Sequence, residues 1–385
     1  MKQIYLDNQS TTPIDPDVFS AMEPWLKDKF GNAASRNHLY GWEAEEAVEI
    51  ARESVAAIIE ALPKEIIFTS GGTEANNLAL QGSAKFYQDK GKHIITVSTE
   101  HKAVLDVCAY LEKEGFLMTR LPVHSDGLLD LNKFEQSIQE ETILVSVMHV
   151  NNEIGIIQPI RKIGAICKKR DIIFHVDAAQ SVGKIPVNVN EMGIDLLSIS
   201  AHKLYGPKGV GALYMRRKNP RIQLQPIIFG GGHEGGIRSG TLPVSNIVGF
   251  GKACKLAIKV MEEESLKIDA LRNQLLEAII TDNPNVKVNG SMEERVAGNL
   301  NISFLGMNNE AIIAAVPEIA ISSGAACTTS TMEPSHVLLA LGLSKEEAYS
   351  SLRFGIGRFN TEKDVETATK VINRCMQKLT KMSYV

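Results

Sequence analysis

The chain has few cysteines, no long apolar run and no strong excess of charge. Its 385 residues include five cysteines, an odd number, and no two of them form a Cys-x-x-Cys pair. This usage indicates neither a disulfide framework nor a zinc knuckle, so at least one thiol must be free. No window approaches the roughly 18 apolar residues of a membrane span. A net charge of −4 gives no basic field for nucleic acid or an anionic membrane. We therefore expect a cytoplasmic protein that binds neither of them directly.

What the chain does have is the composition of an ordinary globular protein, with 44% hydrophobic and 22% charged residues. From about residue 44 to 215, helical patterns alternate with apolar runs at 66–68, 94–97, 143–147, 172–176, 196–199 and 210–214. Because these runs are apolar throughout, they predict central strands of a mostly parallel sheet covered by helices. The glycine-rich segment 230–236 predicts a surface loop, and the helical pattern at 248–280 with the short strands after it predicts a smaller α+β domain.

Asp177 and Lys203 are the most informative pair in the sequence. Each follows an apolar strand pattern directly or within a few residues. Pyridoxal phosphate needs an amine to hold its aldehyde as a Schiff base and an anion to keep its ring nitrogen protonated, because only the pyridinium is a good electron sink. At about 4 Å and an effective dielectric near 20, such an ion pair is worth roughly 4 kcal/mol, or about three pKa units. The pair therefore predicts a pyridoxal phosphate site with the Schiff base on Lys203.

Polar residues that end other strands would meet beside this pair, because ligands of open α/β sheets bind at the carboxyl ends of the strands. Gly72 and Thr73 open a helix, where backbone N–H groups and a hydroxyl can bind the phosphate. Ser200 and His202 could reach the same phosphate. Each has a structural alternative: a plain capping turn at Thr73, and strand-end groups that satisfy the backbone at Ser200 and His202.

Four further side chains are candidates for contacts with the cofactor ring or the substrate. His101 could stack on the ring and exchange protons, or could merely cap a helix. Asn152 and Gln180 each place an amide where it could meet the cofactor's phenol oxygen or a substrate carboxylate. Arg353 is flanked by apolar residues, and its guanidinium suits an amino-acid carboxylate.

Two other patterns indicate neither a dinucleotide site nor a metal site. The glycines of 206–211 are not spaced as in a dinucleotide fingerprint, and a strand pattern follows where a helix should begin. His175 lies on the same strand face as Asp177, but no third ligand stands at metal-site spacing, so we expect no metal centre.

Small and polar residues surround Cys327 in the segment 322–336. Such a stretch has little apolar surface to anchor it, so we expect it to be mobile and to expose the thiol. The other four cysteines lie in helical patterns and are expected to be inert core residues, namely Cys108, Cys167, Cys254 and Cys375.

In order along nearly the whole chain, these motifs resemble the cysteine desulfurases. The segments that carry the resemblance are Tyr5-Leu6-Asp7-Asn8, Ser70-Gly71-Gly72-Thr73-Glu74, Thr99-Glu100-His101, His175-Val176-Asp177-Ala178-Ala179-Gln180, Ser200-Ala201-His202-Lys203, Arg238-Ser239-Gly240-Thr241 and the Cys327 segment. The resemblance implies a fold type I pyridoxal phosphate enzyme, with a mostly parallel seven-stranded sheet in a large domain at 13–254. It also implies a smaller α+β domain formed by 1–12 and 255–385, with a mobile catalytic loop at about 323–335.

The resemblance further implies a reaction and the residues that perform it. L-cysteine would bind with its carboxylate on Arg353 and Asn152, and Lys203 would remove its Cα proton. The Cys327 thiolate would then attack the substrate sulfur, which leaves L-alanine and a persulfide on Cys327. Because an ordinary thiol is mostly protonated at neutral pH, a proton acceptor is needed, and His101 is the candidate.

The same resemblance implies partners. Thr241 would reach the cofactor phosphate of the other subunit in a homodimer. The long loop is similar to that of the class that passes sulfur to iron–sulfur cluster assembly and tRNA thiolation, so an iron–sulfur scaffold or another acceptor protein is expected. Cys327 could share a transient cluster with such a scaffold. The chain stops at Val385 without the longer tail of some members, and we expect a scaffold to dock differently from the way it does in long-tailed relatives.

Two alternatives stay open. A transaminase or a selenocysteine lyase would share Asp177 and Lys203 but would need no mobile cysteine. A cofactor-bound but inactive subunit could serve only to bind a sulfur-handling partner, although the presence of Lys203, His101 and Cys327 argues against it.

Overall fold

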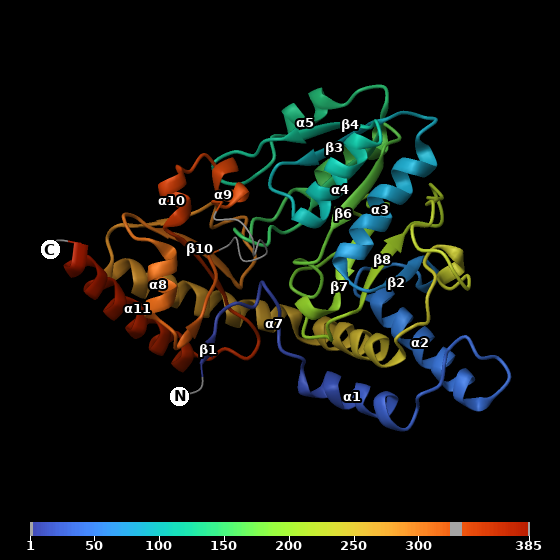
Figure 1. Cartoon of the computed structure of the whole chain (residues 1–385), viewed down its shortest axis with the longest axis horizontal. Coiled ribbons are helices and arrows are strands. Elements are labelled where there is room, and N and C mark those ends of the chain that lie inside the picture. Colours follow the sequence, from blue (N-terminus) through green and yellow to red (C-terminus); the bar gives the residue numbers. More distant parts are fainter. Residues whose placement is uncertain (1–2, 324–332, 384–385) are drawn as a thin grey trace.

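A computed structural model describes residues 3–323 and 333–383 of the chain. A large domain is built on a seven-stranded sheet, and a smaller domain surrounds a three-stranded sheet (Figure 1). The strands of the large sheet, in their order across it, are β2 (Ile66–Thr69), β8 (Gly211–Met215), β7 (Leu196–Ser200), β6 (Ile173–Asp177), β5 (Thr142–Met148), β3 (His93–Val97) and β4 (Leu117–Leu121). β8 runs antiparallel to both of its neighbours, and the other adjacent strands are parallel. The predicted α/β fold with a mostly parallel sheet is confirmed.

Both faces of this sheet are buried because helices cover each of them. The helices of the large domain are α1 (Pro16–Lys27), α2 (Leu39–Ala57), α3 (Gly72–Tyr87), α4 (Lys102–Lys113), α5 (Leu131–Ser137), α6 (Ile160–Lys169) and α7 (Val244–Asp282). Phe68 of β2 packs in one core with α2, α6 and α7, while its neighbour Ile67 packs in a second core with α3 and α4. Successive strand residues point to opposite faces, so burial on both sides explains why the strand patterns are apolar throughout.

The small domain consists of segments from both ends of the chain. Its elements are β1 (Ile4–Tyr5), β9 (Val286–Val288), β10 (Asn299–Phe304), α8 (Asn309–Ala315), β11 (Ile319–Ala320), α9 (His336–Ala340), α10 (Lys345–Tyr349), β12 (Ser351–Gly355) and α11 (Glu362–Ser383). β12, β10 and β9 form an antiparallel sheet, and β1 pairs with β11 in parallel. Leu6, which directly follows β1, packs in the core of this domain together with Phe354 of β12.

α7 connects the two domains as one 39-residue helix, which crosses between them in Figure 1. Its first half contributes Phe250 to a core of the large domain, and its second half contributes Leu275 to the core of the small domain. The predicted division at 254/255 falls within this helix and stays a prediction. Within the described ranges, no helix is long and apolar enough to cross a membrane.

The local patterns missed three strands, namely β4, β12 and the two-residue β1, and part of one loop. β4 is an edge strand in which Leu117 is 56% exposed, so it lacks the apolar run that marked the central strands. β12 contains Arg353, and the buried charge interrupts its apolar pattern. The glycine-rich segment was expected to be loop throughout, but it includes one 3₁₀ turn, η3 (Glu234–Gly236), with Gly235 at a φ of 64°. Two further 3₁₀ turns are η1 (Pro63–Glu65) and η2 (Ala201–Lys203).

Arg358, which follows β12 of the small domain, forms ion pairs with Asp15, near the start of the chain, and with Glu264 of α7. Its guanidinium donates to both carboxylate oxygens of Glu264 on α7 at 3.0 Å and to Asp15 Oδ2 at 2.8 Å. It also lies over the ring of Tyr205, 4.1 Å from the ring centroid. Since Arg358 has only a 15% exposed side chain, this cluster is shielded from solvent and stronger than a surface ion pair.

We expect Arg358→Met to lower the free energy of unfolding by about 3 kcal/mol, because two partly buried carboxylates would lose their cation. Equilibrium urea unfolding measures the loss. The matched control is Arg161→Met, which removes an exposed pair with Glu191 and should change stability by less than about 1 kcal/mol. Equal effects of the two substitutions would contradict the structural role of the Arg358 cluster.

Candidate active site

Asp177 is the last residue of β6 and is held by two donors. Asn76 of α3 donates from Nδ2 to Asp177 Oδ2 at 2.7 Å, and the Ala179 backbone N–H donates to Oδ1 at 3.0 Å. The side chain is buried, with 4% of the residue exposed. Two donors from different elements fix the plane of the carboxylate, which is what a partner of a ring nitrogen requires. Asn76 was not predicted, because a polar residue in a helix gives no local signal of what it faces.

Lys203 ends η2, the turn that follows β7. Its Nζ donates to the backbone oxygens of Gln9 at 2.5 Å and Ser10 at 2.6 Å. The amide of Gln180 donates from Nε2 to the same Gln9 oxygen at 2.7 Å. Lys203 and Gln180 therefore meet on one carbonyl of the N-terminal segment, a contact that the sequence did not reveal.

The N-terminus of α3 lies against the end of β7. A Cβ placed on Gly72 would be 3.6 Å from the Cβ of Ser200 and 3.8 Å from that of Ala179. Gly71, at a φ of 154°, caps the helix without a side chain, and the Thr73 side chain is exposed. Gly72, Thr73 and Ser200 are thus brought together at a helix N-terminus, where backbone N–H groups favour an anion such as phosphate.

His202, the fourth predicted phosphate ligand, has a partner inside the protein. Its Nδ1 lies 3.0 Å from Thr11 Oγ1. Burial lowers the pKa of His202 to about 4, with smaller contributions from Lys203, Lys208 and Lys184. The ring is therefore neutral at physiological pH, and its role towards a phosphate stays a prediction.

His101 is the N-cap of α4, which agrees with the predicted alternative that it caps a helix. Its Nδ1 accepts from the Ala103 backbone N–H at 3.0 Å, so the neutral ring carries its proton on Nε2. Burial lowers the pKa of His101, the charge of Asp177 opposes this shift, and Lys203 adds to it. The capping role leaves Nε2 for other chemistry, so the two roles do not exclude each other.

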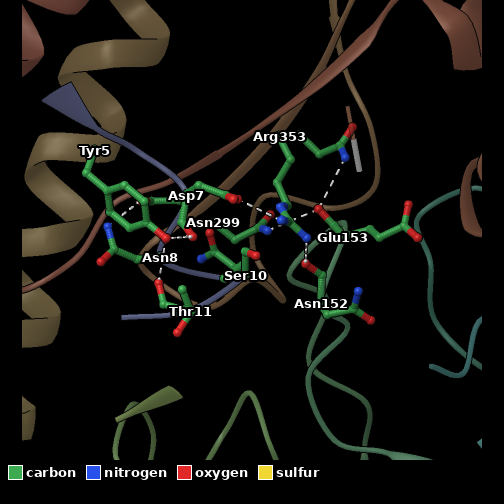
Figure 2. A network of polar contacts seen from close by, with 12 residues as sticks. Tyr5, Asp7, Asn8, Ser10, Thr11, Asn152, Glu153, Asn299 and Arg353 are labelled. Carbon is green, nitrogen blue, oxygen red and sulfur yellow. Dashed lines mark hydrogen bonds and ion pairs between the residues drawn. The ribbon is translucent and has the colours of Figure 1, made fainter. Parts of the chain in front are cut away.

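Arg353 is the most buried charged side chain of the site, with 2% of the residue exposed. Figure 2 shows its guanidinium between Asp7 and the chain at Asn152: Nη2 donates to Asp7 Oδ1 at 2.7 Å, and Nη1 donates to the Asn152 backbone oxygen at 2.9 Å. Among the described residues its Nε has no hydrogen-bond partner. A fully buried donor without an acceptor is costly, which favours a ligand oxygen there. Asp7 was quoted only as part of a motif, and its ion pair with Arg353 was not predicted.

Glu153, next to Asn152, binds the C-terminal end of the Cys327 segment. Ser335 Oγ donates to Glu153 Oε2. The Glu153 backbone oxygen accepts from Asn299 at 3.1 Å (Figure 2). His336 Nε2 lies 3.0 Å from the backbone oxygen of Glu100. Burial raises the pKa of Glu153 to about 7, partly offset by Ser335 and Arg353.

Cys327 itself lies outside the described residues. The other four cysteines are buried, in agreement with the prediction: Cys108, Cys167, Cys254 and Cys375. Burial raises the pKa of each, that of Cys108 to about 12, so none of them is a ready nucleophile.

His175 serves the core of the sheet. Its ring nitrogens contact Ser146 Oγ on β5 at 2.8 Å and Ser198 Oγ on β7 at 3.0 Å. In the described part of the chain, no three His, Cys, Asp or Glu side chains are grouped so as to hold a metal ion.

Comparison with known proteins identifies the family. The model of the aminotransferase class-V family matches residues 4–367. The chain is 53% identical over 380 residues to the protein named cysteine desulfurase IscS of Rickettsia typhi, covering 99% of this chain and 92% of that one. The chain belongs to the cysteine desulfurases of the aminotransferase class-V family. A mitochondrial cysteine desulfurase of Arabidopsis thaliana is also 53% identical, with 99% of this chain and 84% of that protein covered.

Solved structures support the same family. A NifS-like protein superposes with a TM-score of 0.91 at 34% identity, covering 97% of this chain and 99% of that one. A structure described as SspA in complex with cysteine gives a TM-score of 0.82 at 38% identity, covering 93% and 99%. The expected membership of the cysteine desulfurase family and the fold type are therefore confirmed.

The raised pKa of Glu153 predicts a pH dependence of stability. Burial raises the pKa of this carboxyl in the folded protein from its ordinary value of 4.5 to about 7, so the folded state binds the proton more tightly than the unfolded state does. Its stabilising contribution is full below about pH 4.5 and is lost as the pH rises through about 7. At about pH 8 we expect Glu153→Gln, which keeps an acceptor for Ser335, to be more stable than the unmodified protein by about 2 kcal/mol.

Urea unfolding across this pH range measures the difference, which should shrink towards zero near pH 5. Exposed Glu293→Gln is the control and should give no such trend. A Glu153→Gln difference that is the same at all pH values would contradict the raised pKa.

Proposed function

We propose that this chain is a pyridoxal-phosphate-dependent cysteine desulfurase that converts L-cysteine to L-alanine and forms a persulfide on Cys327. The observation that carries the proposal is the meeting of an amine, an anion and a helix N-terminus at the ends of β6, β7 and α3, within a chain of this family. When bound, pyridoxal phosphate supplies an electron sink for the charge that remains after the substrate loses its Cα proton.

The residues present fit this cofactor. Asp177, fixed by Asn76, would hold the ring nitrogen, and Lys203 would hold the aldehyde carbon. The backbone at Gly72 and Thr73, together with Ser200, would hold the phosphate. These donors and acceptors match three of the polar groups of the cofactor, namely the ring nitrogen, the aldehyde and the phosphate, which supports the assignment.

Arg353 would bind the substrate carboxylate through the guanidinium edge that includes Nε, which lacks a partner among the described residues. Asp7 and the Asn152 backbone hold the other groups of the guanidinium in place. Such positioning orients the substrate Cα proton towards a fixed base. Lys203 would be that base, and His101 Nε2 would carry a proton between the site and the thiol of Cys327.

The atoms and electrons of the sulfur transfer balance, so the step needs no external oxidant. The thiolate of Cys327 forms an S–S bond with the substrate sulfur as the Cβ–S bond breaks. The carbon keeps the electron pair of the broken bond and gains a proton, which yields the methyl group of alanine. The acceptor of the persulfide sulfur would be an iron–sulfur scaffold or another protein, with tRNA thiolation as a possible destination.

We infer a homodimer in which Thr241 completes the cofactor site of the other subunit. Thr241 is exposed on the single chain, and Phe229 in the same connection between β8 and α7 is 78% exposed. A large exposed phenyl group close to a polar ligand is consistent with a surface that a second copy covers. The cytoplasmic location stays a prediction, and one of the relatives is named as mitochondrial.

Incubation of the purified holoenzyme with L-cysteine tests the reaction. We expect alanine and sulfide without a keto-acid acceptor, and a sulfur adduct on Cys327 in mass spectra of the protein. Cys327→Ser should abolish sulfide release, while Cys108→Ser, in the core, should keep it. Lys203→Ala should lose the visible absorption of the bound cofactor.

Other outcomes would favour the alternatives. Dependence on a keto-acid acceptor would indicate a transaminase, and release of selenide but not sulfide would indicate a selenocysteine lyase. Unchanged sulfide release by Cys327→Ser would remove the cysteine from the mechanism, and no turnover at all in a cofactor-bound protein would indicate a binding subunit.

Subunit complementation tests the role of Thr241. We expect Thr241→Val to weaken cofactor retention about tenfold, as for loss of one hydrogen bond to a charged group. Co-expression with Lys203→Ala should restore one tight site per dimer, because the Lys203→Ala chain supplies an intact Thr241 to the other subunit. Retention that is not restored in isolated mixed dimers would show that Thr241 acts within its own chain, and a monomer in sedimentation would rule out the shared site.

A further inference from the structure

Lys184 lies in the turn after β6, four residues beyond Gln180, and its amine points at the site already described. Lys184 Nζ donates to Gln180 Oε1 at 2.6 Å. Both Lys184 and Lys203 line a narrow cavity of about 40 Å³ between the domains, which Gln9 and Glu264 also border. In the described part of the chain no carboxylate is within ion-pair distance of Lys184, and Glu264 is instead bound to Arg358. Burying a lysine amine without a carboxylate partner costs free energy of folding. We therefore expect Lys184 to have a function.

We propose that Lys184 is a positioning residue that fixes the side-chain amide of Gln180, so that Gln180 presents hydrogen-bond donors, and not its oxygen, to the phenol oxygen of the cofactor. This inference rests on the proposed function, because it concerns a residue that would act on the bound cofactor through Gln180. It adds Lys184 to the residues that set the chemistry of the site.

The two ends of the Gln180 amide have opposite partners. Oε1 accepts from the Lys184 amine, and Nε2 donates to the Gln9 backbone oxygen at 2.7 Å. Rotation of the amide by half a turn would place two donors face to face at Lys184 and two acceptors face to face at Gln9. The observed orientation is therefore strongly favoured. Nε2 carries a second hydrogen, which is available for an acceptor on the cofactor.

The same Gln9 oxygen accepts from Lys203 Nζ at 2.5 Å. Lys184, Gln180, Gln9 and Lys203 thus form one continuous chain of hydrogen bonds, and a change at Lys184 can reach the cofactor-binding lysine without any movement of the sheet. Gln180 is 4% exposed, so water does not readily replace a lost donor at its oxygen.

The charges around Lys184 do not reverse this arrangement. Burial, together with the charges of Lys203 and Arg353, lowers the pKa of Lys184 to about 7, and Glu264 opposes this shift. The charged and the neutral amine both donate to Oε1, so the amide keeps its orientation on either side of this pH. Lys184 would then act mainly by holding the orientation of the Gln180 amide. Its charge would make a second contribution to the chemistry of the cofactor, which an experiment can separate from the first.

The test is the pH midpoint of the visible absorption of the cofactor in purified holoenzyme, a measurement that does not require turnover. A donor at the phenol oxygen favours the form in which this oxygen carries more negative charge, which is the form above the midpoint. We expect Lys184→Met, which keeps the volume of the stem but removes the donor, to raise the midpoint by about one pH unit. The exposed Lys133→Met should leave the midpoint unchanged.

A double substitution separates geometry from charge. If Lys184 acts through the amide, Lys184→Met should give no further shift in a Gln180→Ala background. An equal shift in that background would show that the lysine charge acts directly on the cofactor and would overturn the inference. So would an unchanged midpoint in Lys184→Met. Lys184→Ala, expected to give the same shift, replaces the methionine variant if that protein does not fold. A wild-type protein without any visible cofactor band would instead overturn the proposed function.

Discussion

The site depends on positive charge that the protein itself only partly neutralises. Arg353, Lys203 and Lys184 lie close enough for Lys203 and Arg353 to lower the pKa of Lys184. Asp7 pairs with Arg353, whereas the Lys184 amine donates to a neutral oxygen, Oε1 of Gln180. Neutral oxygens compensate a desolvated cation less well than carboxylates do. Such a cluster is therefore suited to anionic ligands, which a phosphate and a substrate carboxylate would provide.

The first residues of the chain hold this cluster in place. β1 pairs with β11 in the small domain, and residues 7–10 then cross to the large domain. On the way, Asp7 contacts Arg353 of the small domain, and Gln9 contacts Lys203 and Gln180 of the large one. Because one short segment contacts groups from both domains, the relative position of Arg353 and Lys203 is set by backbone geometry and not by long side chains alone.

The sequence predicted the groups that directly follow strands, and missed the groups that position them. Asp177 and Lys203 could be recognised because an apolar strand pattern that stops at a charge marks the edge of a sheet. Asn76 and Asp7 could not, since each is an ordinary polar residue locally, and its partner is more than a hundred residues away. The edge strand β4 was missed for a related reason, because its exposure depends on its place in the sheet and not on its own residues. Only a long-range contact distinguishes such residues from surface residues.

The described residues on both sides of Cys327 are held close to Arg353. Before it, Ser322 exchanges backbone hydrogen bonds with Arg353, at 2.7 and 3.3 Å. After it, Ser335 is bound to Glu153, and Glu153 follows directly on Asn152, whose backbone oxygen accepts from the same arginine. Cys327 is five residues from Ser322 and eight from Ser335. The described ends of the Cys327 segment are therefore both held close to Arg353, the residue proposed to bind the substrate carboxylate.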